Sequence, residues 1–328
     1  MRAIWRYGVI TALLTVTVAA SAQAQAAEYP AKPVQIIVDS PAGSTPDVAL
    51  RFVAEELSRS WGQQAVVVNR PGAGGSIAAR VAADAAPDGY TLYQPVLSTF
   101  VALHPAAPNV PLHVPSDFLP IGFVAENPMF LAAPPSLGVS TLPELIELAK
   151  KRPGEISYAA TGVGRLTHLT GELLQYKAGI KLELVPYTAG GPANAISDVA
   201  TGRVSMIIEG YSGIAASVQA GSLRLIAVAS AKRLADFSNV PTVSETIPDF
   251  VATGWGILVA PLKTPEAIIQ KVSRDVYQAT SQPELQKKLA KLGSYTRPMT
   301  PLEATAFVHA QQNMWNPVLA AVAQKQQK

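Results

Sequence analysis

Short apolar runs alternate with amphipathic segments along most of the chain. The first run, Val34–Val38, is β-branched and typical of a strand. It ends abruptly at the polar stretch DSPAGSTPD, residues 39–47, and a helical pattern of apolar positions follows from Val48 to Leu57. Thr45-Pro46-Asp47 supplies residues that favour the first turn of a helix. The pattern therefore predicts a strand, a tight turn and a helix start.

The same alternation continues to the C-terminus. Further strands are predicted at Ala65–Val68, Thr91–Tyr93, Ile121–Ala125, Met129–Ala133, Ile156–Ala160, Leu182–Val185, Val204–Ile208, Leu223–Ala229 and Gly256–Ala260. Helices are predicted at Ile77–Ala86, Thr141–Arg152, Leu169–Lys177, Pro265–Thr280 and Glu284–Leu292, with a final helix after Thr300. Capping boxes head two of these helices, and Pro317 should bend or stop the last one. Regular alternation predicts an α/β fold with mostly parallel sheets.

The first 26 residues have the pattern of a secretory signal. Arg2 and Arg6 precede the apolar stretch from Val9 to Ala20, and small-residue cleavage sites follow it. The apolar part is too short to span a bilayer comfortably, so a retained N-terminal anchor is the less favoured alternative. We expect an exported, soluble protein, with the bacterial periplasm as its compartment. About 300 residues then remain, which suggests two domains.

Charge and cysteine content exclude some classes of protein. Without Arg2 and Arg6, the 26 basic residues become 24 against 23 acidic ones, a net charge of about +1. Such a balance gives no field that would attract nucleic acid or acidic lipid. The chain contains no cysteine, which excludes a disulfide framework.

Motifs for catalysis are missing. The chain has no G-x-S-x-G nucleophile elbow and no phosphate-binding loop that ends in Gly-Lys-Ser/Thr. Gly162 and Gly164 begin a dinucleotide-like pattern, but Thr167 stands where the third glycine belongs. Metal-ligand spacing is also missing among His104, His113, His168 and His309. We therefore expect no enzyme activity, no cofactor and no metal.

Two strand–turn–helix units remain as candidates for binding. One follows Val34–Val38 and the other follows Ile156–Ala160, and each turn contains glycine. A helix N-terminus presents unpaired backbone N–H groups that hold anions well. Ligands of open α/β sheets bind beyond the carboxyl ends of strands, where both turns lie. The sequence thus predicts two helix starts that face one cleft and hold one anion.

The chain contains a series of distinctive segments, in this order: YPAKPVQIIV, SPAG, VVVNRPGAGGSIAA, AAPDGYTL, TGVGRLTHLTGELL, VPYTAGGPA, GSLRLIAVASAKR, VPTVSET and GWGILVAP. In these segments the chain resembles the Bug family, the periplasmic solute receptors of tripartite tricarboxylate transporters. The resemblance covers essentially the whole mature chain. It implies a two-domain periplasmic binding protein in which two α/β domains, joined by a hinge, close on a ligand like a flytrap.

The resemblance also implies a domain division and partners. We place residues 27–127 and 250–300 in the first domain and residues 128–249 and 301–328, with the C-terminal helix, in the second. The implied ligand is a small organic carboxylate, whether di- or tricarboxylate or aromatic acid, and the implied partners are inner-membrane transporter subunits. We expect a monomer. Signalling to a sensor kinase and, less favoured, an exported enzyme are the alternatives.

In relatives, the two turns grip one carboxylate through backbone N–H groups, hydroxyls and ordered water. Carried over to this chain, the candidate ligand-binding residues are Ala42, Gly43, Ser44, Thr45, Asp47, Ser98, Thr99, Gly162, Gly164, Arg165, Thr167, His168, Ala189, Gly190 and Glu209. Apolar walls could come from Phe100, Phe130, Tyr211 and Trp255, although each aromatic is more often core than pocket.

Roles within this set stay open at this point. We expect Asp47 to cap and order its turn, because a second negative charge would repel the anion. Ser44 and Thr45 either donate to the ligand or cap the helix. Arg165, where relatives commonly carry serine, either binds a second anionic group or is solvated at the rim. Glu209 either accepts a hydrogen bond from the ligand or pairs with Arg165.

Overall fold

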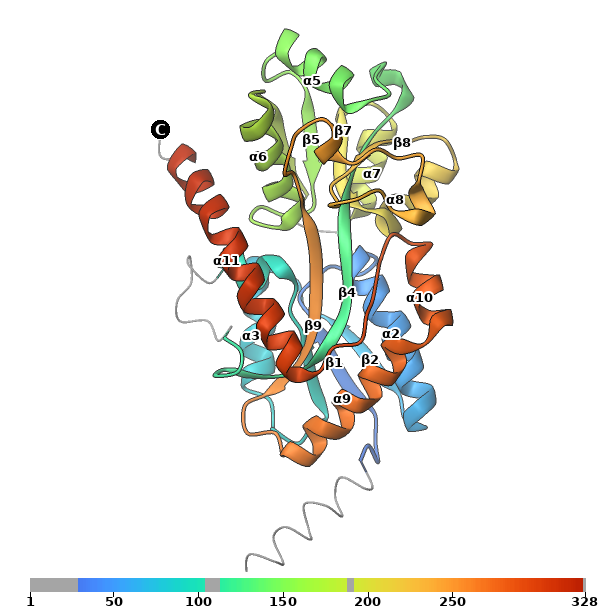
Figure 1. Cartoon of the computed structure of the whole chain (residues 1–328), viewed down its shortest axis with the longest axis vertical. Helices are drawn as coiled ribbons and strands as arrows, with labels where there is room; N and C mark the ends of the chain where they lie inside the picture. The colour runs from blue at the N-terminus through green and yellow to red at the C-terminus, as the bar shows by residue number, and fades with distance from the viewer. Residues whose placement is uncertain (1–28, 104–112, 188–191, 327–328) are drawn as a thin grey trace, which may run out of the picture.

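Two long strands run side by side through the molecule and join its two lobes (Figure 1). They are β4 (Phe118–Ala133) and β9 (Thr253–Pro261), paired antiparallel from Phe118 opposite Pro261 to Pro128 opposite Thr253. The computed structural model describes residues 29–103, 113–187 and 192–326. The signal segment predicted at 1–26 and the candidates Ala189 and Gly190 lie outside these ranges.

The first lobe is built on parallel strands at one end of this pair. β1 pairs parallel with β2 and β3, and β3 pairs antiparallel with β9, which gives the order β2-β1-β3-β9-β4. The elements of this lobe are β1 (Val34–Val38), α2 (Thr45–Trp61), β2 (Ala65–Asn69), α3 (Ser76–Ala83), β3 (Thr91–Gln94), α9 (Glu266–Ser281) and α10 (Pro283–Ala290). α2 buries Leu50, Val53 and Leu57 against the sheet. Of the apolar face predicted for this helix, Val53 and Leu57 are buried, whereas Val48 and Phe52 are half-buried.

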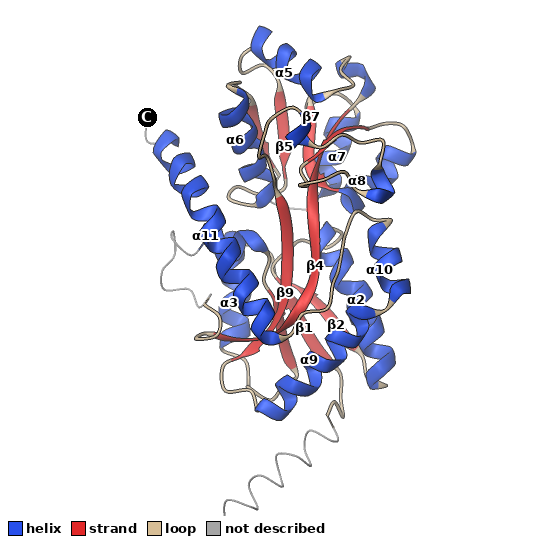
Figure 2. Ribbon diagram, viewed as in Figure 1, coloured by secondary structure: helices blue, strands red, loops and turns tan. Residues whose placement is uncertain are grey.

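The second lobe repeats this plan at the other end. β5 pairs parallel with β6 and β7, while β7 and β8 pair antiparallel with β4 (Figure 2). Its elements are α5 (Leu142–Lys151), β5 (Ser157–Ala160), α6 (Leu166–Ala178), β6 (Glu183–Pro186), α7 (Pro192–Ala200), β7 (Met206–Gly210), α8 (Tyr211–Gln219) and β8 (Arg224–Val228). The predicted α/β class is confirmed, with two lobes that each contain parallel strands.

Short helical turns connect these elements. They are η1 (Ala73–Gly75), η2 (Thr99–Leu103), η3 (Pro135–Leu137), η4 (Ala235–Phe237) and η5 (Val243–Glu245). Of the described helices, none combines the length and apolar character that a membrane span requires.

β4 differs from the prediction, which divided it into two strands. Glu126-Asn127-Pro128 suggested a break, because polar residues and proline usually interrupt strands. In the structure these residues pair with Trp255, Gly254 and Thr253 of β9. The Ser294 hydroxyl also donates to Asn127 Oδ1 at 2.7 Å. Tertiary pairing therefore outweighs the local signal and makes β4 one continuous strand.

The last helix, α11 (Pro301–Gln326), lies along the side of the molecule (Figure 1). Its Phe307 ring packs edge-on to the rings of Phe123 and Trp255, and Gln312 Nε2 donates to the Phe100 carbonyl at 3.3 Å. These contacts lie in the first lobe and on the strands that join the lobes, whereas placement of 301–328 in the second domain stays a prediction. Pro317 was predicted to bend or stop this helix. The stop is wrong, because the helix continues to Gln326, since a proline removes only one helical N–H, and the bend stays a prediction.

Candidate functional site

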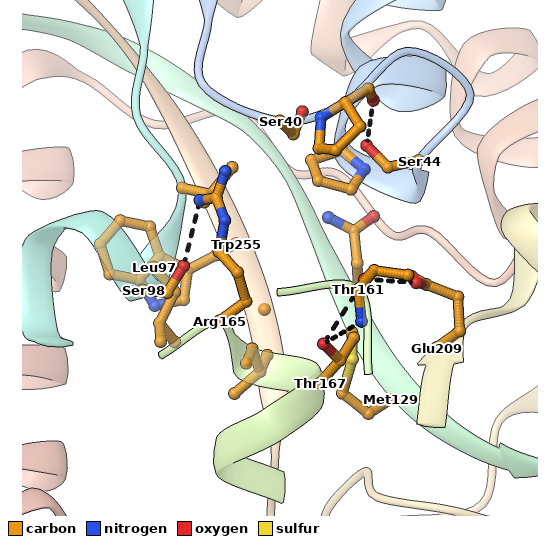
Figure 3. A pocket seen from close by; sticks show the side chains of 16 residues that line it. Ser40, Ser44, Leu97, Ser98, Met129, Thr161, Arg165, Thr167, Glu209 and Trp255 are labelled. Atoms are coloured by element: carbon orange, nitrogen blue, oxygen red, sulfur yellow. Dashed lines mark hydrogen bonds between the residues drawn. The ribbon is translucent and has the colours of Figure 1, made fainter. Parts of the chain in front are cut away.

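A cavity of about 70 Å³ lies between the lobes, at the carboxyl ends of β1 and β5 (Figure 3). This is the edge of the sheet where the two turns were predicted to meet. The cavity is lined by Ser40, Pro41, Ser44, Pro46, Val96, Leu97, Ser98, Asn127, Met129, Thr161, Arg165, Leu166, Thr167, Glu209, Gly254 and Trp255.

Five of the predicted residues line this cavity: Ser44, Ser98, Arg165, Thr167 and Glu209. The other described candidates are not part of the lining: Ala42, Gly43, Thr45, Asp47, Thr99, Gly162, Gly164 and His168. Sequence reasoning missed the polar lining residues Ser40, Asn127 and Thr161. Thr161 directly follows a predicted strand and Ser40 is the second residue after one, which is a usable signal. Asn127 lies between two predicted strands and had no such signal.

The first turn is ordered by Asp47 at the start of α2. Its Oδ2 accepts the Gly43 N–H at 2.9 Å, and its Oδ1 accepts from Asn69 Nδ2 at 2.8 Å. Arg51 lies 3.0 Å from Oδ1 and balances the charge. Gly43 has a φ of +77°, a conformation that glycine adopts without strain. Asp47 therefore holds the turn from behind and does not line the cavity.

The hydroxyls of Ser44 and Thr45 do not cap α2. Ser44 is the N-cap, but its Oγ donates to the Pro41 carbonyl at 2.6 Å. Pro46 stands at the second position of the helix, where it removes one of the two N–H groups that an N-cap side chain normally accepts from. Thr45 Oγ1 instead accepts from Ser212 Oγ of α8 at 2.9 Å, which is a contact between the lobes.

The second turn is ordered by two residues of α6. Thr167 Oγ1 accepts the Thr161 N–H at 3.1 Å, and His168 Nδ1 accepts the Gly164 N–H at 3.1 Å. Burial lowers the pKa of His168, and Glu172, whose carboxylate lies 3.8 Å from Nε2, opposes that shift. An accepting Nδ1 requires a ring without a proton on that atom. His168 is thus a positioning residue behind the turn.

Arg165 crosses from the second lobe into the first (Figure 3). Its Nη1 lies 3.5 Å from Asp39 Oδ1 and 3.3 Å from Ser98 Oγ, while Nη2 donates to the Asp39 carbonyl. The side chain is 13% exposed. Arg165 is therefore neither solvated at the rim nor paired with Glu209.

Asp39, the partner of Arg165, was not among the candidates. It follows β1 directly and is fully buried. Its Oδ2 accepts from Thr99 Oγ1 at 2.5 Å and from Tyr93 Oη at 3.0 Å, whereas buried Oδ1 has no hydrogen-bond partner. Burial raises the pKa of Asp39, and Arg165, Thr99 and Tyr93 act in the opposite direction. Thr99, predicted to touch ligand, instead supports this carboxylate.

Glu209 ends β7 and brings a second buried carboxylate to the cavity. Its Oε2 accepts from Thr161 Oγ1 and its Oε1 from the Gly210 N–H, both at 2.9 Å. Within the described ranges, no basic side chain lies within ion-pair distance of it. Burial raises the pKa of Glu209 above its ordinary value, with the two hydrogen bonds opposing the shift.

The burial of Glu209 predicts that the folding stability of the ligand-free protein depends on pH. A raised pKa means that the folded state binds the Glu209 proton more tightly, so stability falls as pH rises through the raised pKa. We expect Glu209→Gln to raise the melting temperature at pH 8 and to have little effect at pH 4. Thermal melts across this range would measure it, with the exposed Glu183→Gln as a matched control. Equal effects of Glu209→Gln at both pH values would contradict a buried charge.

One of the four candidate aromatic residues lines the cavity. Trp255 of β9 forms a wall, and Phe100 stacks on it at 5.8 Å between ring centroids. Phe130 and Tyr211 pack against each other at 5.6 Å, away from the lining. Among the residues that the structure describes, no cluster of three or more His, Cys, Asp or Glu side chains could hold a metal ion.

Sequence comparisons match this architecture. Residues 49–323 match the family model described as the tripartite tricarboxylate transporter family receptor. BugT from Bordetella pertussis is 33% identical over 318 residues, which cover 96% of this chain and 97% of BugT. A second relative, a UPF0065 protein from Agrobacterium vitis, is 35% identical over 289 residues, which cover 87% of this chain and 82% of that protein.

Solved structures agree with the sequence matches. A Rhodopseudomonas palustris protein solved with adipate superposes with a TM-score of 0.85 at 29% identity, covering 90% of this chain and 98% of that one. MatC from the same organism, solved with bound malate, gives a TM-score of 0.79 at 26% identity over 89% of this chain and 100% of MatC.

Proposed function

We propose a function from the premise that the chain belongs to the Bug family of tripartite tricarboxylate transporter receptors, which are periplasmic solute-binding proteins. It captures a small organic carboxylate in the cavity between its lobes and delivers it to the membrane subunits of a transporter. The relatives solved with adipate and malate support a carboxylate as the ligand class. This assignment places the protein in the periplasm and gives it a binding role rather than a catalytic one.

The observation that carries the proposal is the pair of helix starts at one cavity. α2 begins beside Ser44 and α6 begins beside Arg165 and Thr167, and all three residues line the cavity. The first N–H groups of each helix have no acceptor within the helix. One helix start contributes about 0.3–2 kcal/mol toward an anion. Two turns with several donors, in a cavity that sheds water, can reach the roughly 8 kcal/mol of micromolar binding.

A thermal-shift screen of carboxylates tests the binding. A ligand at about 100 times its dissociation constant stabilises the folded protein by about 2.7 kcal/mol, which is readily measured as a rise in melting temperature. We expect at least one mono-, di-, hydroxy or aromatic carboxylate to raise the melting temperature, and the corresponding amide to have no effect. Equal shifts with acid and amide would contradict recognition of the carboxylate group.

Uptake measurements test the delivery. We expect deletion of the transporter's membrane subunits to abolish uptake of the ligand that the screen identifies. If uptake persists in the deletion strain, delivery to that transporter is wrong. A transcriptional response to the ligand in the same strain would favour the sensor-kinase alternative.

A further inference from the structure

The positive charge of Arg165 is paired with a carboxylate of the protein itself. Its guanidinium contacts three oxygen atoms of the first lobe: Asp39 Oδ1, the Asp39 carbonyl and Ser98 Oγ. Asp39 is fully buried and its carboxylate is the nearest counter-charge. Two of its five N–H groups are used in hydrogen bonds to these oxygens, and its positive charge is balanced by Asp39 at 3.5 Å. The guanidinium therefore attracts a second anionic group on a ligand less strongly than a cation without a counter-charge would.

The remaining charge at the cavity is negative. Arg165 is the one basic side chain among the described residues that line it, and Glu209 is the one acidic side chain. Glu209 accepts hydrogen bonds from Thr161 and from its neighbour Gly210, and none of the described basic side chains forms an ion pair with it. A ligand with a second carboxylate would therefore find no free counter-charge and would face a buried carboxylate as well.

The cavity is also lined by neutral polar side chains, among them Ser40 and Asn127. Ser40 is buried, and its Oγ has no hydrogen-bond partner within the described residues. Asn127 accepts from Ser294 through Oδ1, which leaves its NH₂ group as a donor at the cavity. A ligand hydroxyl can donate and accept, so it can bond to Ser40, Asn127 and Glu209. A protonated amine only donates, so it can bond to Ser40 Oγ and to Glu209. A buried hydroxyl left without a partner costs free energy until a ligand satisfies it.

We propose that Asp39 is a specificity-determining residue: by engaging Arg165, it makes the cavity select monocarboxylates whose far end carries a hydrogen-bond donor, and reject dicarboxylates. The proposal rests on the proposed carboxylate-binding function and names its substrate class. It corrects the expectation that Arg165 favours a second anionic group. It also separates this chain from the relatives that were solved with adipate and malate.

Matched ligand series test the proposal by calorimetry. The six-carbon series is hexanoate, 6-hydroxyhexanoate, 6-aminohexanoate and adipate, and the four-carbon series is butyrate, 4-hydroxybutyrate, 4-aminobutyrate and succinate. Members of each series share one carboxylate and differ in the group at the other end. We expect the wild-type mature protein to bind the hydroxy or amino acid at least 10-fold more tightly than the dicarboxylate of equal length.

Asp39→Asn releases Arg165 while the size of the side chain is kept. We expect this variant to gain at least 10-fold in its relative affinity for the dicarboxylate. Adding Arg165→Gln to Asp39→Asn should remove that gain, since it removes the released charge. Asp84→Asn is the control, because it deletes the same charge at an exposed position that does not line the cavity, and it should leave the preference unchanged.

The outcomes separate this inference from the proposed function. Two results would overturn the specificity role of Asp39 and leave carboxylate binding intact. The first is a wild-type protein that binds the dicarboxylate most tightly. The second is an Asp39→Asn variant whose affinity for every ligand changes by the same factor. Failure of both proteins to bind any member of either series would overturn the proposed function together with the inference.

Discussion

Gly164→Asp is expected to abolish carboxylate binding while both lobes stay folded. Gly164 has a φ of +77°, and a Cβ added there meets no atom within 4 Å. Asp and Asn tolerate this backbone conformation better than other residues with side chains. The new carboxylate would stand at the start of α6, where the proposed function places the carboxylate of the ligand. At about 4 Å and an effective dielectric constant of about 20, two such charges repel by about 4 kcal/mol.

Calorimetry with the ligand found by screening measures this effect. We expect a loss of at least about 100-fold in affinity. Gly164→Asn is the matched control, since it has the same shape and backbone preference without the charge, and it should lose far less. Gly43→Asp, in the first turn, has the same open surroundings and a φ of +77°, and should behave like Gly164→Asp. Unchanged affinity in both Asp variants would refute a carboxylate site shared by the two turns.

Arg165→Leu is expected to destabilise the ligand-free protein by about 3 kcal/mol at pH 8. The substitution leaves the fully buried Asp39 without its counter-charge, and removing one partner of a buried ion pair costs about 3–5 kcal/mol. We place the effect at the lower end because the charged atoms are 3.5 Å apart and Thr99 and Tyr93 still donate to Asp39. Urea unfolding curves would measure the loss.

A double-mutant cycle with Asp39→Asn assigns this loss to the pair. The double variant buries no uncompensated carboxylate, so it should be more stable than Arg165→Leu alone, with a coupling of about 2 kcal/mol. The cost of Arg165→Leu should also shrink at pH 4. Burial raises the pKa of Asp39, so protonation on acidification removes the unpaired charge. Additive single effects, or a cost independent of pH, would show that the two side chains do not interact.

The elements nearest the N-terminus were predictable because local signals and tertiary packing agree there. Val34–Val38 is a strand with its predicted bounds, and α2 begins at Thr45, where Pro46 and Asp47 favour a helix start. α5 likewise has the predicted capping box between Thr141 and Glu144. β4 was predicted as two strands because its polar centre is stabilised by pairing with β9, which local sequence does not encode.

The candidate site also has a part that the sequence predicted and a part that it did not. The two turns were visible as glycine-containing stretches between a strand and a helix, and both reach the cavity. The pairing of Asp39 with Arg165 was not visible, because the two residues lie 126 positions apart and meet only across the lobes. Asp47 and His168 were predicted to bind ligand, yet their side chains accept backbone N–H groups of the two turns and do not line the cavity. Sequence pattern located the loops, while contacts distant in sequence decided which side chains face the cavity.

The antiparallel pair β4–β9 has a mechanical consequence. Its ladder runs from Phe118–Pro261 to Pro128–Thr253 with two register shifts, so the two strands that cross between the lobes belong to one ribbon. The strands of such a ribbon are already extended and cannot lengthen much, whereas the twist between paired strands varies widely. A change in the angle between the lobes can therefore be divided into small changes of twist at many residues of the two strands. Such a change costs elastic energy and requires no strand pair to break.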